Sequence, residues 1–215
     1  MKLVAISVGR PTETQWRGRS VQTSIFKTPV SRRVHVTRFN VEGDQQSDLS
    51  VHGGPEKAVY AYPAEHYDFW RRELPAAELP WGVFGENFTI EGLLEDDVWI
   101  GDRYRIGTVE LVVTQPRMPC YKLGIRFERP DMVTRFLQSR RSGFYLAVER
   151  EGEVGAGDAI ERVARDERRL SVADVVALYA TDSANQASLE NASDHPSLPA
   201  TWREYFRKRL STPDA

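Results

Sequence analysis

The feature that most constrains the fold is a series of short apolar stretches, separated by glycines and prolines, across most of the first 165 residues. KLVAISV, VQTSIFK and RRVHVTRF are rich in apolar and β-branched residues, and KAVYAY, NFTI, DRYRIG, VELVVTQ and GFYLAVE continue the pattern. Short runs of this kind between turn signals are typical of β-strands. Many short strands with few helices predict a sandwich or a closed barrel.

Two segments inside this region predict helices instead. The segment PAEHYDFWRREL (63–74) opens with a proline suited to a first helical turn, and its apolar face is formed by Tyr67, Trp70 and Leu74. The segment DMVTRFLQS (131–139) has a similar face, formed by Met132, Val133, Phe136 and Leu137. We therefore expect a mainly β domain with a few inserted helices.

The last fifth of the chain has a different, helical pattern. SVADVVALYA (171–180) begins with a helix-capping serine, Ser171, and carries the acidic residue Asp174 three positions later. LPATWREYFRKRL (198–210) has apolar residues at helical spacing, and the polar stretch between the two segments leaves room for a short third helix. We predict a β-barrel-like domain over residues 1–166 and a small helical domain over 167–215.

Composition excludes several classes of protein. The chain has 215 residues, 40% of them hydrophobic, a net charge of -2 and a single cysteine. This length allows one good core, and the charge argues against a general nucleic-acid binder, whose signature is a basic surplus. One cysteine excludes an intramolecular disulfide framework and fits a reducing compartment. No stretch resembles a signal peptide or a membrane span, so we expect a soluble, cytoplasmic protein.

Two glycine-rich segments carry residues suited to a binding site. In DLSVHGGPEKAVYAYP (48–63), the turn His52-Gly53-Gly54 lets backbone N–H groups approach an anion, and Lys57 is expected to begin a strand. In WGVFGENFTIEGL (81–93), Asn87 follows a glycine pair and offers both a donor and an acceptor. Taken alone, each segment is also consistent with an ordinary turn or loop.

The lone thiol lies in a third segment, QPRMPCYKLG (115–124). Two prolines rigidify the backbone around Arg117 and Cys120, and Lys122 follows two residues later. Cys120 is either a small buried hydrophobic residue or a thiolate stabilised by nearby positive charge. One cysteine and four scattered histidines cannot form a structural zinc site. A metal here would have to arrive with most of its ligands attached, as in an organic cofactor.

Taken together and in order, VHGGPEKAVYAYPAEHYDFW, FGENFTIEGL and QPRMPCYKL resemble the signature stretches of MOSC-domain proteins of the YiiM type. VEGDQQSD (41–48), VGAGD (154–158) and the helical tail are similar to that type as well. The resemblance implies a MOSC β-barrel with a three-helix extension and a molybdenum cofactor of the pterin dithiolene kind. It implies that Cys120 is the protein ligand of the metal, and the residues expected to hold the cofactor are Arg117, Lys122, Lys57, His52, Gly53, Gly54 and Asn87.

The YiiM type is associated with reduction of N-hydroxylated compounds, including hydroxylaminopurine base analogues, by cleavage of the N–O bond. We therefore expect an oxidoreductase in which His52 relays protons and a separate reductase supplies electrons, with no zinc and no flavin in this chain. The resemblance leaves open whether the chain forms a homodimer. Two alternatives are a sulfur carrier with a persulfide on Cys120 and a non-enzymatic carrier of the molybdenum cofactor.

Overall fold

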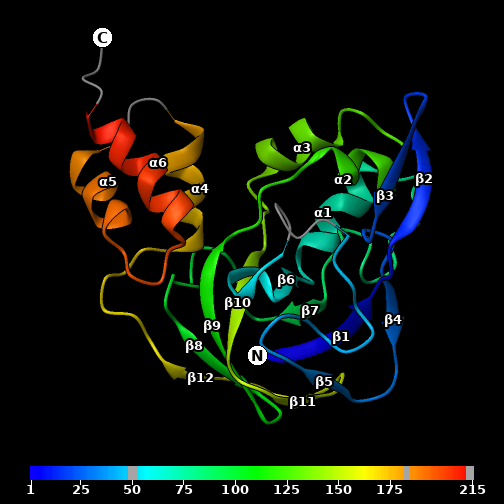
Figure 1. Ribbon diagram of the computed structural model, residues 1–215, viewed down its shortest axis with the longest axis horizontal. Coiled ribbons are helices and arrows are strands. Elements are labelled where there is room, and N and C mark those ends of the chain that lie inside the picture. Colours follow the sequence, from blue (N-terminus) through cyan, green and yellow to red (C-terminus); the bar gives the residue numbers. More distant parts are fainter. Residues whose placement is uncertain (48–52, 182–184, 212–215) are drawn as a thin grey trace.

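The computed structural model describes residues 1–47, 53–181 and 185–211, and their main feature is a mixed eight-stranded sheet (Figure 1). Only the pair β6–β7 is parallel, and the other neighbours in this sheet are antiparallel. In spatial order its strands are β12 (Ile160–Ala164), β8 (Arg103–Ile106), β9 (Val109–Pro116), β10 (Phe144–Arg150), β6 (Val59–Pro63), β7 (Phe88–Glu91), β1 (Lys2–Val8) and β4 (Thr28–Val30).

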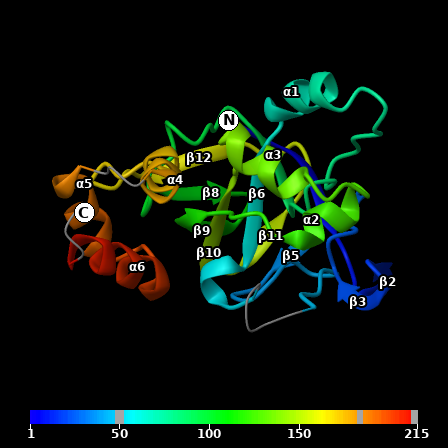
Figure 2. The same cartoon turned by 90° about the horizontal axis from the view of Figure 1, so that it is seen from above.

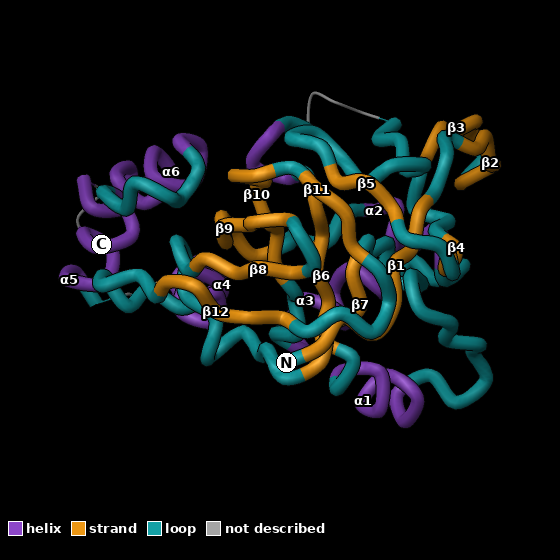
Figure 3. The backbone as a smooth tube through the Cα atoms, turned by 90° about the horizontal axis from the view of Figure 1, so that it is seen from below, coloured by secondary structure: helices purple, strands orange, loops and turns teal. Residues whose placement is uncertain are grey.

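The sheet curls so that β1 reaches the segment just before β12 (Figure 3). The backbone N–H of Leu3 donates to the carbonyl of Asp158 at 2.9 Å, and the N–H of Ile160 donates to the carbonyl of Met1 at 3.0 Å. These bonds lie between β1 and the start of β12, which are far apart in the strand order. The mainly β architecture expected from the sequence is therefore confirmed, in the form of a strongly curled sheet.

Two small strand pairs flank the main sheet. The strands β5 (Val34–Val36) and β11 (Gly152–Val154) form one pair. The strands β2 (Thr12–Trp16) and β3 (Arg19–Thr23) form a hairpin at one end of the molecule (Figure 1). VQTSIFK was expected to be one strand, but β3 ends at Thr23, and the next residues line a cavity instead.

The inserted helices lie together on one side of the sheet (Figure 2). The helices α1 (His66–Glu73) and α3 (Met132–Ser139) confirm that both predicted segments are helical, but Pro63, which was expected in the first turn, ends β6 instead. The helix α2 (Tyr121–Arg126) was not predicted, because six residues are too few for an apolar period to show. Lys57 was expected to begin a strand, but it ends the 3-10 helix η1 (Pro55–Lys57), and β6 begins at Val59.

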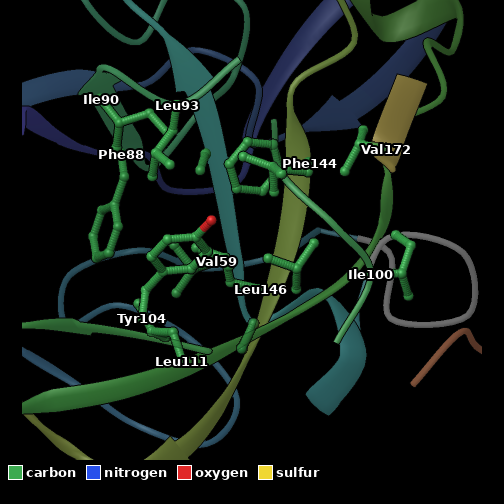
Figure 4. Close-up of a cluster of buried hydrophobic side chains, with 14 of the residues drawn as sticks. Val59, Phe88, Ile90, Leu93, Ile100, Tyr104, Leu111, Phe144, Leu146 and Val172 are labelled. Atoms are coloured by element: carbon green, nitrogen blue, oxygen red, sulfur yellow. The ribbon is translucent and has the colours of Figure 1, made fainter. Parts of the chain in front are cut away.

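The main core fills the inside of the curled sheet, where side chains from many strands meet (Figure 4). Val59 on β6, Phe88 on β7 and Phe144 on β10 are almost completely buried. Along β8 and the first half of β9, buried residues such as Tyr104 and Leu111 alternate with more exposed ones. A second cluster packs under α1 and α3 and is largely aromatic. The short alternating strands thus enclose the main core, and the inserted helices cover the second cluster.

Three helices, α4 (Val172–Ala180), α5 (Gln186–Ser193) and α6 (Ala200–Ser211), follow the sheet and form a separate group beside it (Figures 1 and 2). Ser171 Oγ accepts from the N–H of Asp174 and the Asp174 carboxylate accepts from the N–H of Ser171, both at 2.9 Å, which confirms the predicted cap. No helix within the described ranges is both long and apolar enough to cross a membrane.

Candidate active site

A cavity of about 360 Å³ opens between the turn before β6, the end of β9, the start of α2 and the first turn of α6. Five of the predicted site residues line it: Lys57, Asn87, Arg117, Cys120 and Lys122. Gly53 and Gly54 are not among the residues that line the cavity, and Gly54 has a φ of 99°, which favours glycine in this turn. His52 lies outside the described residues.

Cys120 is placed by the short connection between β9 and α2. Pro116 ends β9, Pro119 precedes the cysteine, and Cys120 adopts an extended backbone conformation (φ −124°, ψ 172°) immediately before α2. Its side chain is partly buried in the cavity wall. The two prolines restrict the backbone on this side, so the thiol is held at a defined place on the wall.

Arg117 is a charged residue of the cavity wall that is buried without an ion pair to any described residue. Its side chain is only 6% exposed, and its guanidinium carbon lies 5.4 Å from the ring centre of Tyr60 and 5.0 Å from that of Phe136. Its Nη1 atom has no hydrogen-bond partner, and no ion pair to Arg117 occurs among the described residues. A buried cation of this kind is stabilised when an anion binds next to it.

The charge of the cavity wall is predominantly positive. Its described residues include one acidic side chain, Asp44, and four basic ones, Lys27, Lys57, Arg117 and Lys122. Burial lowers the pKa of Lys57, which reflects the cost of keeping an ammonium group away from water. Lys122 Nζ donates to Ser47 Oγ at 3.4 Å. The wall is therefore suited to a negatively charged ligand.

Asp44, Lys27 and Asn87 form a connected group on one side of the cavity. Lys27 Nζ contacts Asp44 Oδ1 in a buried ion pair, and Asp44 also accepts from the N–H of Gly9 at 2.7 Å. Asn87 Nδ2 donates to Asp44 Oδ2 at 2.9 Å and to the Ser7 carbonyl at 3.3 Å. The amide hydrogens of Asn87 thus have protein partners, and its predicted contact with a ligand stays a prediction.

Next to this group, Glu86 is buried outside the cavity wall. Its carboxylate accepts from the N–H of Gly82 at 2.9 Å and of Phe84 at 3.1 Å, from Thr89 Oγ1 at 3.1 Å, and from the Tyr67 hydroxyl. Burial raises the pKa of Glu86, and hydrogen bonds from Tyr67, Gly82 and Thr89 oppose this effect. We call these five residues the Glu86 cluster, and its role is to fix the loop before β7.

The C-terminal helices contribute part of the cavity wall. Thr201 and Trp202, in the first turns of α6, line the cavity. Trp202 Nε1 donates to Gln115 Oε1 at 3.0 Å, so the last part of β9 and α6 are joined at this point. Neither Gln115 nor Trp202 was predicted as a site residue, although Gln115 begins the segment that contains Cys120 and Trp202 lies on the apolar face of the last predicted helix.

A molybdenum cofactor of the kind that the resemblance implies fits these residues. Among the described residues, no group of three or more His, Cys, Asp or Glu side chains could hold a bare metal ion. The wall offers instead one cysteine sulfur, a predominantly positive charge and an unpaired guanidinium nitrogen. Such a donor set suits an anionic organic cofactor that carries its own metal ligands.

Comparison with known families agrees with this geometry. The MOSC domain family model matches residues 48–161, and the model of the YiiM-like 3-alpha helix domain matches residues 170–212. The chain therefore belongs to the MOSC-domain family. Its relatives in this family include YiiM proteins, and the crystal structure of one of them covers both the sheet and the three C-terminal helices of this chain.

Three relatives illustrate the likeness. YiiM from Geobacillus stearothermophilus is 38% identical, and its crystal structure superposes with a TM-score of 0.82. The match covers 98% of this chain and 99% of that one. Protein YiiM of Escherichia coli is 35% identical over 87% of this chain and 84% of its own length. A reductase of Gibberella moniliformis is 33% identical over 86% of this chain, which corresponds to 33% of that protein.

Proposed function

We propose that this chain is a molybdenum-cofactor-dependent oxidoreductase that reduces N-hydroxylated compounds, such as hydroxylaminopurine base analogues, by cleaving their N–O bond. The observation that carries the proposal is the buried guanidinium of Arg117, whose Nη1 atom has no hydrogen-bond partner among the described residues while Nη2 donates to the Phe84 carbonyl at 3.5 Å, on the same predominantly basic wall as Cys120. The MOSC family, which in general binds the molybdenum cofactor, and the reductase of Gibberella moniliformis support it.

In this proposal each residue of the wall has a defined task. The sulfur of Cys120 ligates the metal, while Arg117, Lys122 and Lys57 balance the negative charge of the cofactor. The bound cofactor supplies the two-electron reduction, which converts an N–OH group, two electrons and two protons into an N–H group and water. The cavity wall orients the substrate and limits the access of water.

Two parts of the proposal concern groups that the described residues do not contain. His52 is proposed as the proton relay, because an imidazole titrates near neutral pH. A separate reductase is proposed as the source of the two electrons. Both stay predictions. For the proton relay, we expect His52→Asn to lower kcat without loss of molybdenum.

The test is to measure the molybdenum content and hydroxylaminopurine reduction of the wild type and of Cys120→Ala. Both proteins are purified from a host that makes the cofactor and assayed with an artificial electron donor. We expect the metal and the activity in the wild type and the loss of both in the variant. Tyr121→Phe, at the exposed neighbouring residue, is the matched control and should retain both.

A wild type without molybdenum would contradict the proposal, and so would a Cys120→Ala protein that keeps both metal and activity. A persulfide on Cys120 in a metal-free wild type would instead support the sulfur-carrier alternative. Molybdenum bound without any reductase activity would support the alternative of a cofactor carrier.

A further inference from the structure

The contact between Gln115 and Trp202 joins the sheet domain and the C-terminal helices directly at the cavity. Gln115 is 4% exposed and lies next to the last residue of β9, and Trp202 is 9% exposed in α6. Both side chains line the cavity. Because the residues are 87 positions apart in sequence, their hydrogen bond depends on how the helical domain docks.

This hydrogen bond fixes the orientation of the Gln115 amide. An indole N–H can only donate, so the group that faces Trp202 Nε1 has to be the amide oxygen, Oε1. The amide nitrogen, Nε2, then points away from Trp202. Nε2 is buried and has no hydrogen-bond partner among the described residues. Gln115 therefore lines the cavity and keeps one unused donor in its amide group.

A buried polar group without a partner is rare in folded proteins and calls for an explanation. The orphaned group here is a neutral donor, whereas the groups that fit the anionic cofactor are cationic. A neutral amide N–H suits an uncharged acceptor such as a ring nitrogen or a carbonyl oxygen. The chemistry of Gln115 thus differs from that of the Arg117 side of the cavity.

The aromatic residues of the cavity favour a planar ligand. Tyr60, Tyr145 and Trp202 line it. The Trp202 ring is held in place by Tyr179, at 5.6 Å between ring centres, and by Phe206, at 5.7 Å. Rings that are fixed in this way provide apolar surface for a flat heteroaromatic molecule, and the Gln115 amide provides a donor for its ring acceptors.

We propose that Gln115, oriented by Trp202, positions the substrate by donating from its amide nitrogen to an acceptor on a planar heteroaromatic ring. The C-terminal helices then select heteroaromatic N-hydroxylated compounds over those whose ring carries no acceptor. This proposal rests on the reductase function proposed above. Its consequence is that substrate preference, rather than cofactor binding, depends on the docking of α6.

The experiment compares hydroxylaminopurine, whose ring nitrogens are acceptors, with phenylhydroxylamine, whose ring has none. The kcat and KM for both are measured with an artificial electron donor on the wild type, Gln115→Met and Gln115→Glu. Gln115→Met removes both hydrogen-bonding functions, and Gln115→Glu keeps an acceptor for Trp202 but loses the donor. Tyr205→Phe, on the same helix but not in the cavity wall, is the control.

We expect both Gln115 variants to raise the KM for hydroxylaminopurine roughly 10- to 100-fold, as loss of one buried hydrogen bond predicts, with a smaller change in kcat. The KM for phenylhydroxylamine and the molybdenum content should stay as in the wild type. Binding of adenine, the amine that reduction of 6-hydroxylaminopurine yields, should weaken in parallel when it is measured by calorimetry.

The outcomes separate this proposal from the one on which it rests. If the wild type reduces neither compound, the proposed function fails and the assignment of Gln115 fails with it. If the wild type is active but the Gln115 variants change both KM values equally, or neither, only the assignment of Gln115 is overturned. Loss of molybdenum from Gln115→Met and Gln115→Glu would place this residue against the cofactor and also overturn it.

Discussion

The Glu86 cluster and the cavity wall around Arg117 and Gln115 are both buried and polar, but they differ in how their groups are paired. Glu86 accepts from four donors that surround it. Arg117 Nη1 and Gln115 Nε2 are buried without a hydrogen-bond partner. The paired groups around Glu86 fix a loop, whereas Arg117 and Gln115 combine an unpaired buried group with a place in the cavity wall, and this combination is what suits a ligand site.

The largest expected effect is on stability, when the acceptor of the Glu86 cluster is removed. Glu86→Ala leaves buried donors, among them the N–H groups of Gly82 and Phe84, without an acceptor and should lower the free energy of unfolding by roughly 3–5 kcal/mol. Chemical denaturation of the purified protein measures this loss. The stability of Glu86→Gln, which keeps one acceptor oxygen, should lie between those of the wild type and Glu86→Ala. A Glu86→Ala protein as stable as the wild type would contradict the structural role of this cluster.

Gly82 tests the backbone of the same cluster. Its φ is +88°, and an added Cβ would lie 2.7 Å from the Cβ of Ser7. Gly82→Ala should therefore destabilise the protein by about 1–3 kcal/mol through strain, with little effect on the cavity. Gly18→Ala, at a positive φ where an added Cβ meets nothing, is the matched control for the clash. Equal losses in the two variants would show that only the φ value matters.

His195 extends the comparison to the helical domain through its pH dependence. Burial lowers the pKa of His195, and Arg168 acts in the same direction, while Asp166, 3.3 Å from Nε2, opposes them. The unfolded chain therefore takes up the proton at a higher pH than the folded one. The stabilising contribution is fully present above about pH 6.5 and is lost as the pH falls below it. Denaturation at pH 7.5 and 5.5 should show this loss, and His195→Gln should reduce it.

The smallest effect is expected at a paired but exposed group. Arg103 Nε contacts both carboxylate oxygens of Glu149, at 3.0 and 2.8 Å, with the arginine side chain 49% exposed. Arg103→Met should cost only about 0.2–1 kcal/mol, because solvent screens the pair. A larger loss in denaturation experiments would show that pairing counts for more than burial in this protein.

The sequence predicted most of the fold because local patterns determine it. The helices α1, α3, α4 and α6 and the capping box at Ser171 follow from apolar spacing and cap residues over segments of eight or more residues. The short helix α2 and the short strands β2, β4, β11 and β12 were missed, because three to six residues carry too little periodicity. Lys57 was wrongly assigned to the start of a strand, because the turn that begins at Pro55 continues through Lys57 and β6 begins only at Val59.

The candidate site was predicted only where its residues are close together in sequence. Cys120, Arg117 and Lys122 are close in sequence, so a single stretch with two prolines brings them together. Gln115 and Trp202 meet only when α6 docks on the sheet domain, and Lys27 and Asp44, 17 positions apart, meet only when the loops that carry them are folded. Contacts between residues that are far apart in sequence are not visible in local patterns.

The most direct test of the account is to measure both stability and molybdenum content in Arg117→Met. Methionine keeps much of the length of the side chain but carries no charge, so the metal-free protein should be as stable as the wild type or slightly more stable. The same variant, expressed with the cofactor available, should retain far less molybdenum than the wild type. A destabilised Arg117→Met protein that keeps its molybdenum would contradict the claim that this guanidinium binds an anionic ligand.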